Sequence, residues 1–220
     1  MINQEPQKLN QETRDGKLYK YRSIQDFKRF LDILIRGRLY ATEFMYLNDP
    51  MEGVFSYSAN FAPTTISDLR NEKHKTKICS LSKTYQNGLM WSFYADSHKG
   101  CCIEVEPVNP KKAWTELDVK YVDTMYNLNG SSSIEDILSY KSKHWEYEKE
   151  VRFIKTLDSK NRISPYLKVK IKTIYLGIRI DPYDARMIKK MVETINKDKK
   201  ESDQIEVKQM MKDDIDFGYI

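Results

Sequence analysis

The chain has 220 residues, of which 40% are hydrophobic and 31% charged, and its formal net charge is +5. This length supports one full hydrophobic core and is too short for two domains of ordinary size. We therefore expect a single catalytic-type domain over residues 18–220 behind a flexible tail at residues 1–17. The composition is typical of a soluble globular protein. The positive charge permits an anionic partner, such as a nucleotide or a nucleic acid, without requiring one.

The cysteines and the hydropathy of the chain indicate the cellular compartment in which we expect the protein. Cys79 and the adjacent Cys101 and Cys102 make no even framework for disulfides, which favours core thiols in a reducing cytosol. No histidine or cysteine has a partner at metal-ligand spacing, so no metal site is predicted. No apolar run approaches membrane-spanning length, and the polar start lacks a signal peptide's apolar region. We expect a cytoplasmic protein without a membrane partner.

The first predicted elements are a strand and a helix in direct succession. Bulky and basic residues alternate over residues 18–22, as in a strand. Ser23 and Asp26 have capping-box-like spacing for a helix that starts at Ile24. The apolar residues that follow have helical spacing, and Gly37 stands where a left-handed cap ends a helix.

Two places in this first part of the chain carry candidate ligand contacts. The tight strand-to-helix turn would place Lys20 and Arg22 beside the positive end of the helix, where a pyrophosphate binds well. The alternative is that both are exposed cations on a strand face. After a short strand at residues 38–41, an ordered loop carries Asn48 and Asp49, which can contact a ligand or hold the loop's own backbone in an Asx-turn.

The middle of the chain contains a dense aromatic segment. Residues 60–76 are polar and indicate a solvated connection, and residues 77–82 alternate like a strand. In the aromatic segment at residues 89–95, Trp91 and Tyr94 lie three residues apart and share one helical face. We interpret Trp91 as a core residue and Tyr94 as a ligand contact.

The second half is rich in strands. Ser133 and Asp136 repeat the capping pattern, and an apolar stripe predicts a helix that continues to Trp145. Asp181 and Pro182 start another helix. The predicted turn lies at residues 158–161, and the predicted strands span residues 101–106, 117–122, 151–157, 166–171, 174–178 and 205–207.

Three carboxylates lie within five residues, where the helical period changes to that of a strand. Glu150 opens the apolar strand, so a rigid element holds it while its carboxylate stays near the sheet edge. This makes Glu150 the leading catalytic candidate. By pattern alone, Glu146, Glu148 and Lys149 are typical of a solvated helix end.

Four sequence blocks, at residues 19–22, 48–53, 90–95 with Gly100, and 147–152, resemble a widespread bacterial family known as a domain of unknown function. The resemblance extends over about residues 18–180. The layout also resembles a distant ADP-ribosyltransferase. This implies an α+β domain with two small mixed or antiparallel sheets flanked by helices. The chain differs from the commoner patterns because its first strand has no histidine and no clear Ser-Thr-Ser block is present.

The resemblance implies that NAD is the substrate and that ADP-ribose passes to a nucleic acid or protein acceptor. Glu150 would stabilise the oxocarbenium-like ribose, and Glu148 would help to position the acceptor. Such an enzyme is typical of a toxin or phage-defence effector, with an antitoxin or defence protein as its partner. The further implied NAD contacts are Lys20, Tyr21, Arg22, Asn48, Asp49, Ser92 and Tyr94.

Two other functions remain open from the sequence. The charged segment from Glu146 to Lys149, with an upstream aspartate such as Asp118, is compatible with a magnesium-dependent nuclease. A basic, tyrosine-rich surface is also compatible with a non-enzymatic module that binds nucleic acid or a partner protein.

Overall fold

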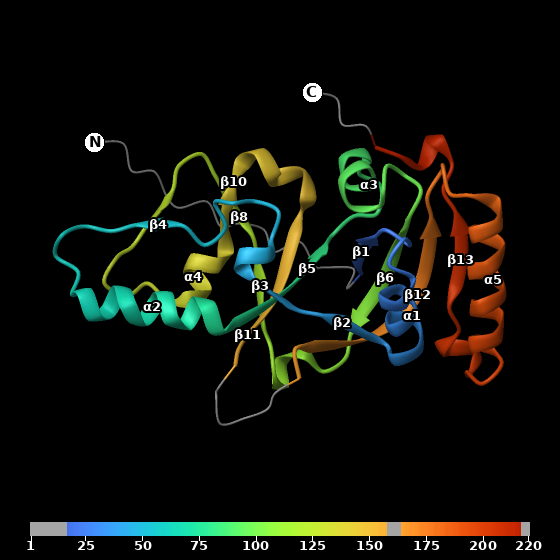
Figure 1. Cartoon of the computed structure of the whole chain (residues 1–220), viewed down its shortest axis with the longest axis horizontal. Helices are drawn as coiled ribbons and strands as arrows, with labels where there is room; N and C mark the ends of the chain where they lie inside the picture. Colours follow the sequence, from blue (N-terminus) through green and yellow to red (C-terminus); the bar gives the residue numbers. More distant parts are fainter. Residues whose placement is uncertain (1–16, 158–163, 217–220) are drawn as a thin grey trace, which may run out of the picture.

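The computed structural model describes residues 17–157 and 164–216, which form one α+β domain around a large, mainly antiparallel sheet (Figure 1). The main strand order is β13-β12-β6-β1-β5-β11-β7, and two short strands, β2 and β3, pair with β12 and β5. The strands of this sheet are β1 (Leu18–Arg22), β2 (Arg38–Tyr40), β3 (Thr42–Glu43), β5 (Thr76–Ser82), β6 (Cys101–Pro107), β7 (Thr115–Asp118), β11 (Glu150–Thr156), β12 (Tyr166–Leu176) and β13 (Glu206–Gln209). Two small sheets pair β4 (Phe55–Ser56) with β9 (Tyr126–Asn127) and β8 (Lys120–Val122) with β10 (Tyr140–Ser142).

The large sheet is nearly divided in two between β1 and β5. Strand β1 pairs with β6 along its whole length, but it pairs with β5 only at Tyr19 and Ser82. The expectation of two small sheets is therefore wrong, because this one pairing joins the two halves into a single nine-stranded sheet. The parting of β1 from β5 leaves side chains of both strands free to face a common space.

Helix α1 (Phe27–Arg36) follows β1 after a short turn, as the sequence predicts. It begins later than Ile24, because the carboxylate of Asp26 caps it by accepting from the backbone N–H of Arg29 at 3.3 Å. It ends at Gly37, whose φ of +56° is left-handed. A Cβ at Gly37 would lie 2.8 Å from the Val169 carbonyl oxygen, so this cap requires glycine.

Four further helices complete the described part of the domain: α2 (Pro63–Lys75), α3 (Gly88–Tyr94), α4 (Ile134–Ser139) and α5 (Pro182–Asn196). The prediction of a solvated connection over residues 60–76 is wrong, because α2 occupies most of it. This helix buries only Ile66 and Lys73, so its sequence has no apolar stripe to reveal it. The capping box predicted at Ser133 and the cap at Asp181 are confirmed.

Several predicted elements have different bounds. The helix expected to continue to Trp145 ends at Ser139, and β10 follows it before the 3-10 turn η3 (Lys143–Glu148). The strand predicted over 117–122 is divided into β7 and β8. The two strands predicted over 166–178 form the single strand β12, which has an irregularity between Ile171 and Thr173. The expected tail at residues 1–17, except for residue 17, and the turn at 158–161 lie outside the described residues.

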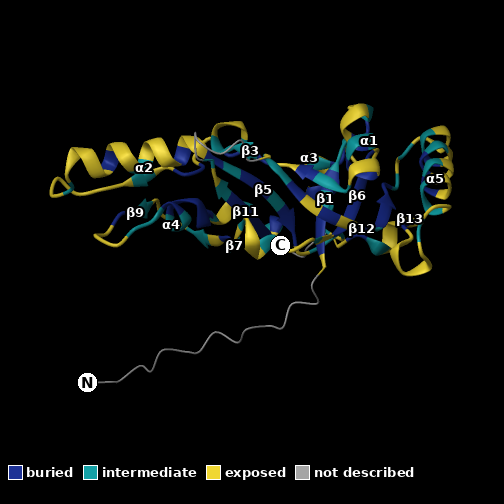
Figure 2. Cartoon of the chain, turned by 90° about the horizontal axis from the view of Figure 1, so that it is seen from below, coloured by how far each residue is buried: buried dark blue, intermediate teal, exposed yellow. Residues whose placement is uncertain are grey.

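Alternating side chains of the central strands enter different apolar clusters. Leu18 joins the cluster under α1 and α5, whereas Tyr19 and Tyr21 join the cluster around α3 and the fully buried Trp91. Figure 2 shows these strands as buried and the outer faces of the helices as exposed. All three cysteines are buried free thiols, as expected. Within the described residues, no helix has the length and apolar character needed to cross a bilayer.

Candidate functional site

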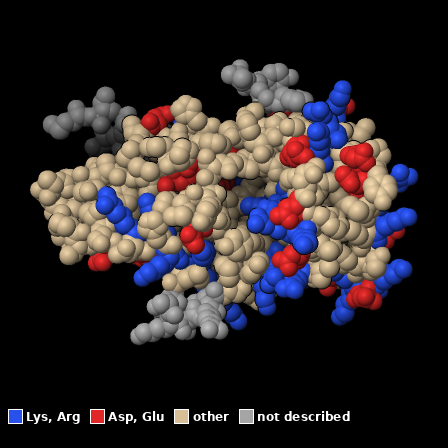
Figure 3. Space-filling model, viewed as in Figure 1, with Lys and Arg blue, Asp and Glu red and all other residues tan. Residues whose placement is uncertain are grey.

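A cleft of about 810 Å³ lies where β1 and β5 part. Its walls come from β1, β5 and the start of β11, from α1 and β2, and from the loop at residues 46–52. Figure 3 shows this face of the molecule hollowed near its middle, with Lys and Arg side chains gathered along one edge of the hollow. The volume is at the upper end of the about 300–1,000 Å³ that is usual for small-molecule sites.

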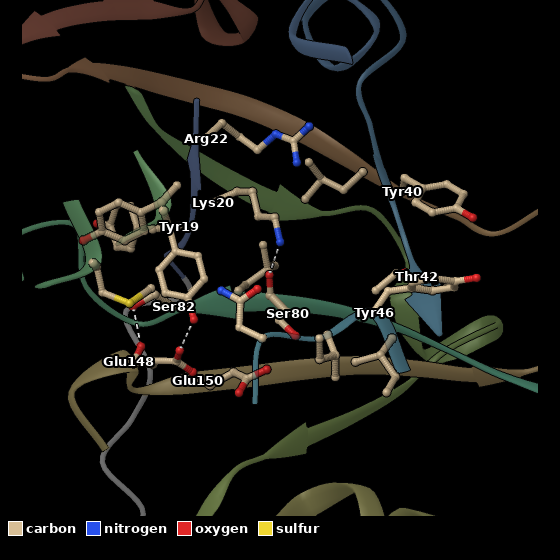
Figure 4. A pocket seen from close by; sticks show the side chains of 18 of the residues that line it. Tyr19, Lys20, Arg22, Tyr40, Thr42, Tyr46, Ser80, Ser82, Glu148 and Glu150 are labelled. Atoms are coloured by element: carbon tan, nitrogen blue, oxygen red, sulfur yellow. Dashed lines mark hydrogen bonds between the residues drawn. The ribbon is translucent and has the colours of Figure 1, made fainter. Parts of the chain in front are cut away.

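Most of the candidate residues meet in this cleft although they come from distant parts of the sequence. Glu148 and Glu150 line one wall and Lys20 and Arg22 another, and Tyr94 of α3 lies beside Glu148 (Figure 4). Asn48 and Tyr21 also line the cleft. The hydroxyl of Tyr21 is already used, because it donates to the Thr84 carbonyl at 3.0 Å.

Two of the candidate contacts do not line the cleft. Asp49 is buried, and its carboxylate accepts from the backbone N–H of Met51 at 2.9 Å. It therefore holds the loop in an Asx-turn, which is the alternative role that the sequence left open. Ser92 is exposed on α3, and its hydroxyl donates to the Gly88 carbonyl at 2.9 Å. Neither Asp49 nor Ser92 is therefore brought into this cleft, and a ligand contact by either of them stays a prediction.

Glu148 is buried rather than part of a solvated helix end, which corrects the pattern-based interpretation. The reason is that η3 turns its side chain inward, where the Tyr94 hydroxyl and the Lys141 ammonium both donate to its carboxylate. Burial raises the pKa of Glu148, although the charge of Lys141 opposes this shift. Glu146 and Lys149 are exposed, as expected.

Glu150 is held much more tightly than Glu148. Arg152 donates to both of its carboxylate oxygens, from Nε and from Nη2, at 2.9 Å each, and the Lys141 ammonium lies 3.2 Å away. Burial alone would raise the pKa of Glu150, but the charges of Arg152 and Lys141 outweigh it and hold the pKa far below the ordinary value. Glu150 therefore stays ionised and fixed.

Sequence reasoning missed three members of this cluster: Glu52, Lys141 and Arg152. The Glu52 carboxylate accepts from Arg152 at 2.7 Å and lies 3.2 Å from the Lys141 ammonium. Because Glu52 comes from the same loop as Asn48, these contacts tie the loop to the carboxylate wall. One signal was present in the sequence: Arg152 interrupts an otherwise apolar strand, and a buried strand tolerates a cation only if that cation is paired.

Lys20 and Arg22 lack such partners. Other cations of the cleft are paired, Arg38 with Asp32 at 3.0 Å in particular. In the described residues, no carboxylate lies within 4.0 Å of either Lys20 or Arg22, and the single hydrogen bond of Lys20 goes to the Ser80 carbonyl at 2.8 Å. The Nε atom of Arg22 is buried without a partner. Burial lowers the pKa of both groups, which indicates that an anion would stabilise them.

The residues considered for a nuclease do not gather in one place, because Glu148 lines the cleft but Glu146, Lys149 and Asp118 do not. Asp118 pairs with Lys83 at 3.0 Å on the far side of β11, and neither Asp118 nor Lys149 lines the cleft. Across residues 17–157 and 164–216, no three His, Cys, Asp or Glu side chains gather as ligands for a metal ion.

The cleft thus combines two cations that have no carboxylate partner in the described part of the chain with a pair of carboxylates, one fixed and one with a raised pKa. These groups come from β1, η3 and β11, which are brought together only by the fold. Comparison of the chain with protein-family models, with curated proteins and with solved structures finds no match.

Proposed function

We propose that this cleft binds NAD, cleaves its N-glycosidic bond to nicotinamide and transfers the ADP-ribose to an acceptor. The observation that carries the proposal is the division of charge within one cavity. Lys20 and Arg22 lie on one wall without anionic partners among the described residues, and Glu148 lies on the other beside Tyr94. NAD has the matching charges, because its pyrophosphate is anionic and its nicotinamide ribose becomes cationic as the bond breaks.

The cation pair favours a small phosphate-bearing ligand over a long nucleic-acid backbone. A protein that follows a nucleic-acid strand neutralises many phosphates along a groove. Here the neighbouring cations Arg29 and Arg38 already pair with Asp26 and Asp32. Two unpaired cations match a single pyrophosphate group.

The bonding pattern favours Glu148 over Glu150 as the carboxylate that contacts the reacting ribose. Glu150 is neutralised by two bonds from Arg152, whereas Glu148 has one neutral donor, Tyr94, and one cation, Lys141. A carboxylate with less charge compensation stabilises a developing oxocarbenium ion better. In this proposal Glu150 fixes Lys141, and Tyr94 places its ring beside the nicotinamide.

The direct test measures nicotinamide release from NAD by the wild type and by Glu148→Gln. This variant keeps the size of the side chain and removes its charge, so we expect turnover to fall about 100- to 1,000-fold. Glu146→Gln is the matched control, because Glu146 lies in the same turn and is exposed. Equal turnover in the wild type and in Glu148→Gln would refute the catalytic role.

Binding can be measured separately from chemistry. NAD at 100 times its dissociation constant should stabilise the protein by about 2.7 kcal/mol, which a thermal unfolding experiment detects. We expect Arg22→Gln to lose this stabilisation, because the variant lacks the guanidinium charge that would pair with the pyrophosphate. Absence of any shift with millimolar NAD would contradict the proposal. Incubation with labelled NAD and either nucleic acid or protein then identifies the acceptor and tests a toxin or defence role.

A further inference from the structure

Three tyrosines line the end of the cleft that lies away from Glu148. Tyr40 belongs to β2, Tyr46 to the 3-10 turn after β3, and Tyr166 to the start of β12. Figure 4 shows Tyr40 and Tyr46 at one end of the cleft, Glu148 toward the other and Lys20 between them. A ligand that passes Lys20 in this direction reaches the tyrosines.

Tyr40 and Tyr166 pack against each other in this wall, and Tyr40 and Tyr46 present available rings. The guanidinium of Arg38 lies 3.8 Å from the centre of the Tyr166 ring, and Tyr40 packs edge-on against that ring at 5.5 Å. Arg38 is in turn fixed by two hydrogen bonds of 3.0 Å to Asp32. Tyr40 and Tyr46 nevertheless remain 55% and 71% exposed. Their rings can therefore accept a planar group without any rearrangement of the fold.

Exposed aromatic rings beside cations are a recurrent arrangement for binding a base next to its phosphates, because every base has a face that stacks. The proposed function places the nicotinamide end of the ligand at Glu148 and the pyrophosphate at Lys20 and Arg22. On that basis we infer that Tyr40 and Tyr46 bind the second base of the dinucleotide. The tyrosine end of the cleft is then the determinant that distinguishes a pyrophosphate group carrying a base from pyrophosphate alone.

The test compares ADP, which carries a base, with pyrophosphate, which does not, by calorimetric titration of the whole chain. The wild type should bind ADP at least about fivefold more tightly, which is the smallest effect expected for one stacked base. Tyr40→Ala and Tyr46→Ala should each weaken ADP binding and leave pyrophosphate binding unchanged. Tyr46→Phe should retain the preference, because it keeps the ring.

Tyr183→Ala is the matched control, since Tyr183 is 68% exposed on α5 and does not line the cleft. Equal affinity of the wild type for ADP and pyrophosphate would overturn the inference, as would an undiminished preference in the Tyr40→Ala, Tyr46→Ala double variant. Either result would overturn the base site even if the protein cleaves NAD. Conversely, a tyrosine-dependent preference for ADP without NAD cleavage supports this base site and refutes the proposed reaction. Absence of binding by both probes at millimolar concentration overturns the two together.

Discussion

The carboxylate wall of the cleft contains cations for its buried carboxylates, whereas the wall formed by β1 presents two cations without carboxylate partners in residues 17–157 and 164–216. On the first wall, Arg152 and Lys141 hold the carboxylates that surround them. On the second wall, Lys20 and Arg22 have almost no polar contacts within the described residues. Charges that already satisfy one another contribute to the fold, and charges left without partners are available to a ligand. Removing a cation from the first wall should therefore lower the free energy of unfolding, whereas removing one from the second wall should raise it.

The largest effect is expected at Arg152, which is fully buried and donates to Glu150, to Glu52 and, at 2.7 Å, to the Leu138 carbonyl. Arg152→Met leaves two carboxylates buried without their main counter-charge. We expect the free energy of unfolding to fall by about 3–5 kcal/mol, as for other broken buried ion pairs. Urea denaturation at neutral pH measures this change.

Arg186→Met is the control for this prediction, because Arg186 is exposed on α5. Its effect should lie within about 0.5 kcal/mol of zero, as for most surface substitutions. A loss below 1 kcal/mol for Arg152→Met would mean that the paired wall does not stabilise the fold, and the contrast between the walls would disappear.

The sequence made the cationic wall and part of the carboxylate wall predictable, for local reasons. Lys20 and Arg22 stand on a strand whose alternation is clear, and Glu150 opens an apolar strand that can be recognised without its neighbours. Lys141 and Glu52 could not be predicted in the same way. Lys141 fell on an apparent helical stripe, and its role depends on the parallel pairing of β10 with β8.

The same distinction applies to the fold. The cap at Gly37 is encoded by one residue, and it was predicted correctly. Helix α2 depends on contacts of Ile66 and Lys73 with segments that are distant in sequence, so the local sequence pattern did not predict it. The single pairing of Tyr19 with Ser82 is equally non-local, and it decides that the sheet is one rather than two.

Substitution of Lys20 should change the free energy of unfolding less than Arg152→Met does, and in the opposite direction. Because its ammonium has one hydrogen bond and, within the described residues, no carboxylate within 4.0 Å, Lys20→Met removes a partly buried charge that the fold compensates only weakly. We expect unfolding at pH 7 to require about 0.5–2 kcal/mol more, as for other substitutions that stabilise at the expense of a functional site. The same variant should bind pyrophosphate more weakly. Destabilisation by more than 1 kcal/mol would show that Lys20 supports the fold instead.

The smallest predicted effect concerns how the free energy of unfolding changes with pH. Burial lowers the pKa of Lys20 below its ordinary value of 10.5, so the folded protein binds fewer protons than the unfolded chain in the window below pH 10.5. Wild-type stability should therefore rise with pH in that window, relative to Lys20→Met.

On the carboxylate wall the sign reverses. Burial raises the pKa of Glu148 above its ordinary value of 4.5, so the folded protein binds more protons than the unfolded chain just above pH 4.5. Wild-type stability should therefore fall as the pH rises through the folded pKa, relative to Glu148→Gln. Denaturation curves at a series of pH values measure both differences. Two slopes of the same sign would show that the walls do not differ in the way that their contacts indicate, because each sign follows directly from whether burial acts on a cation or on an acid.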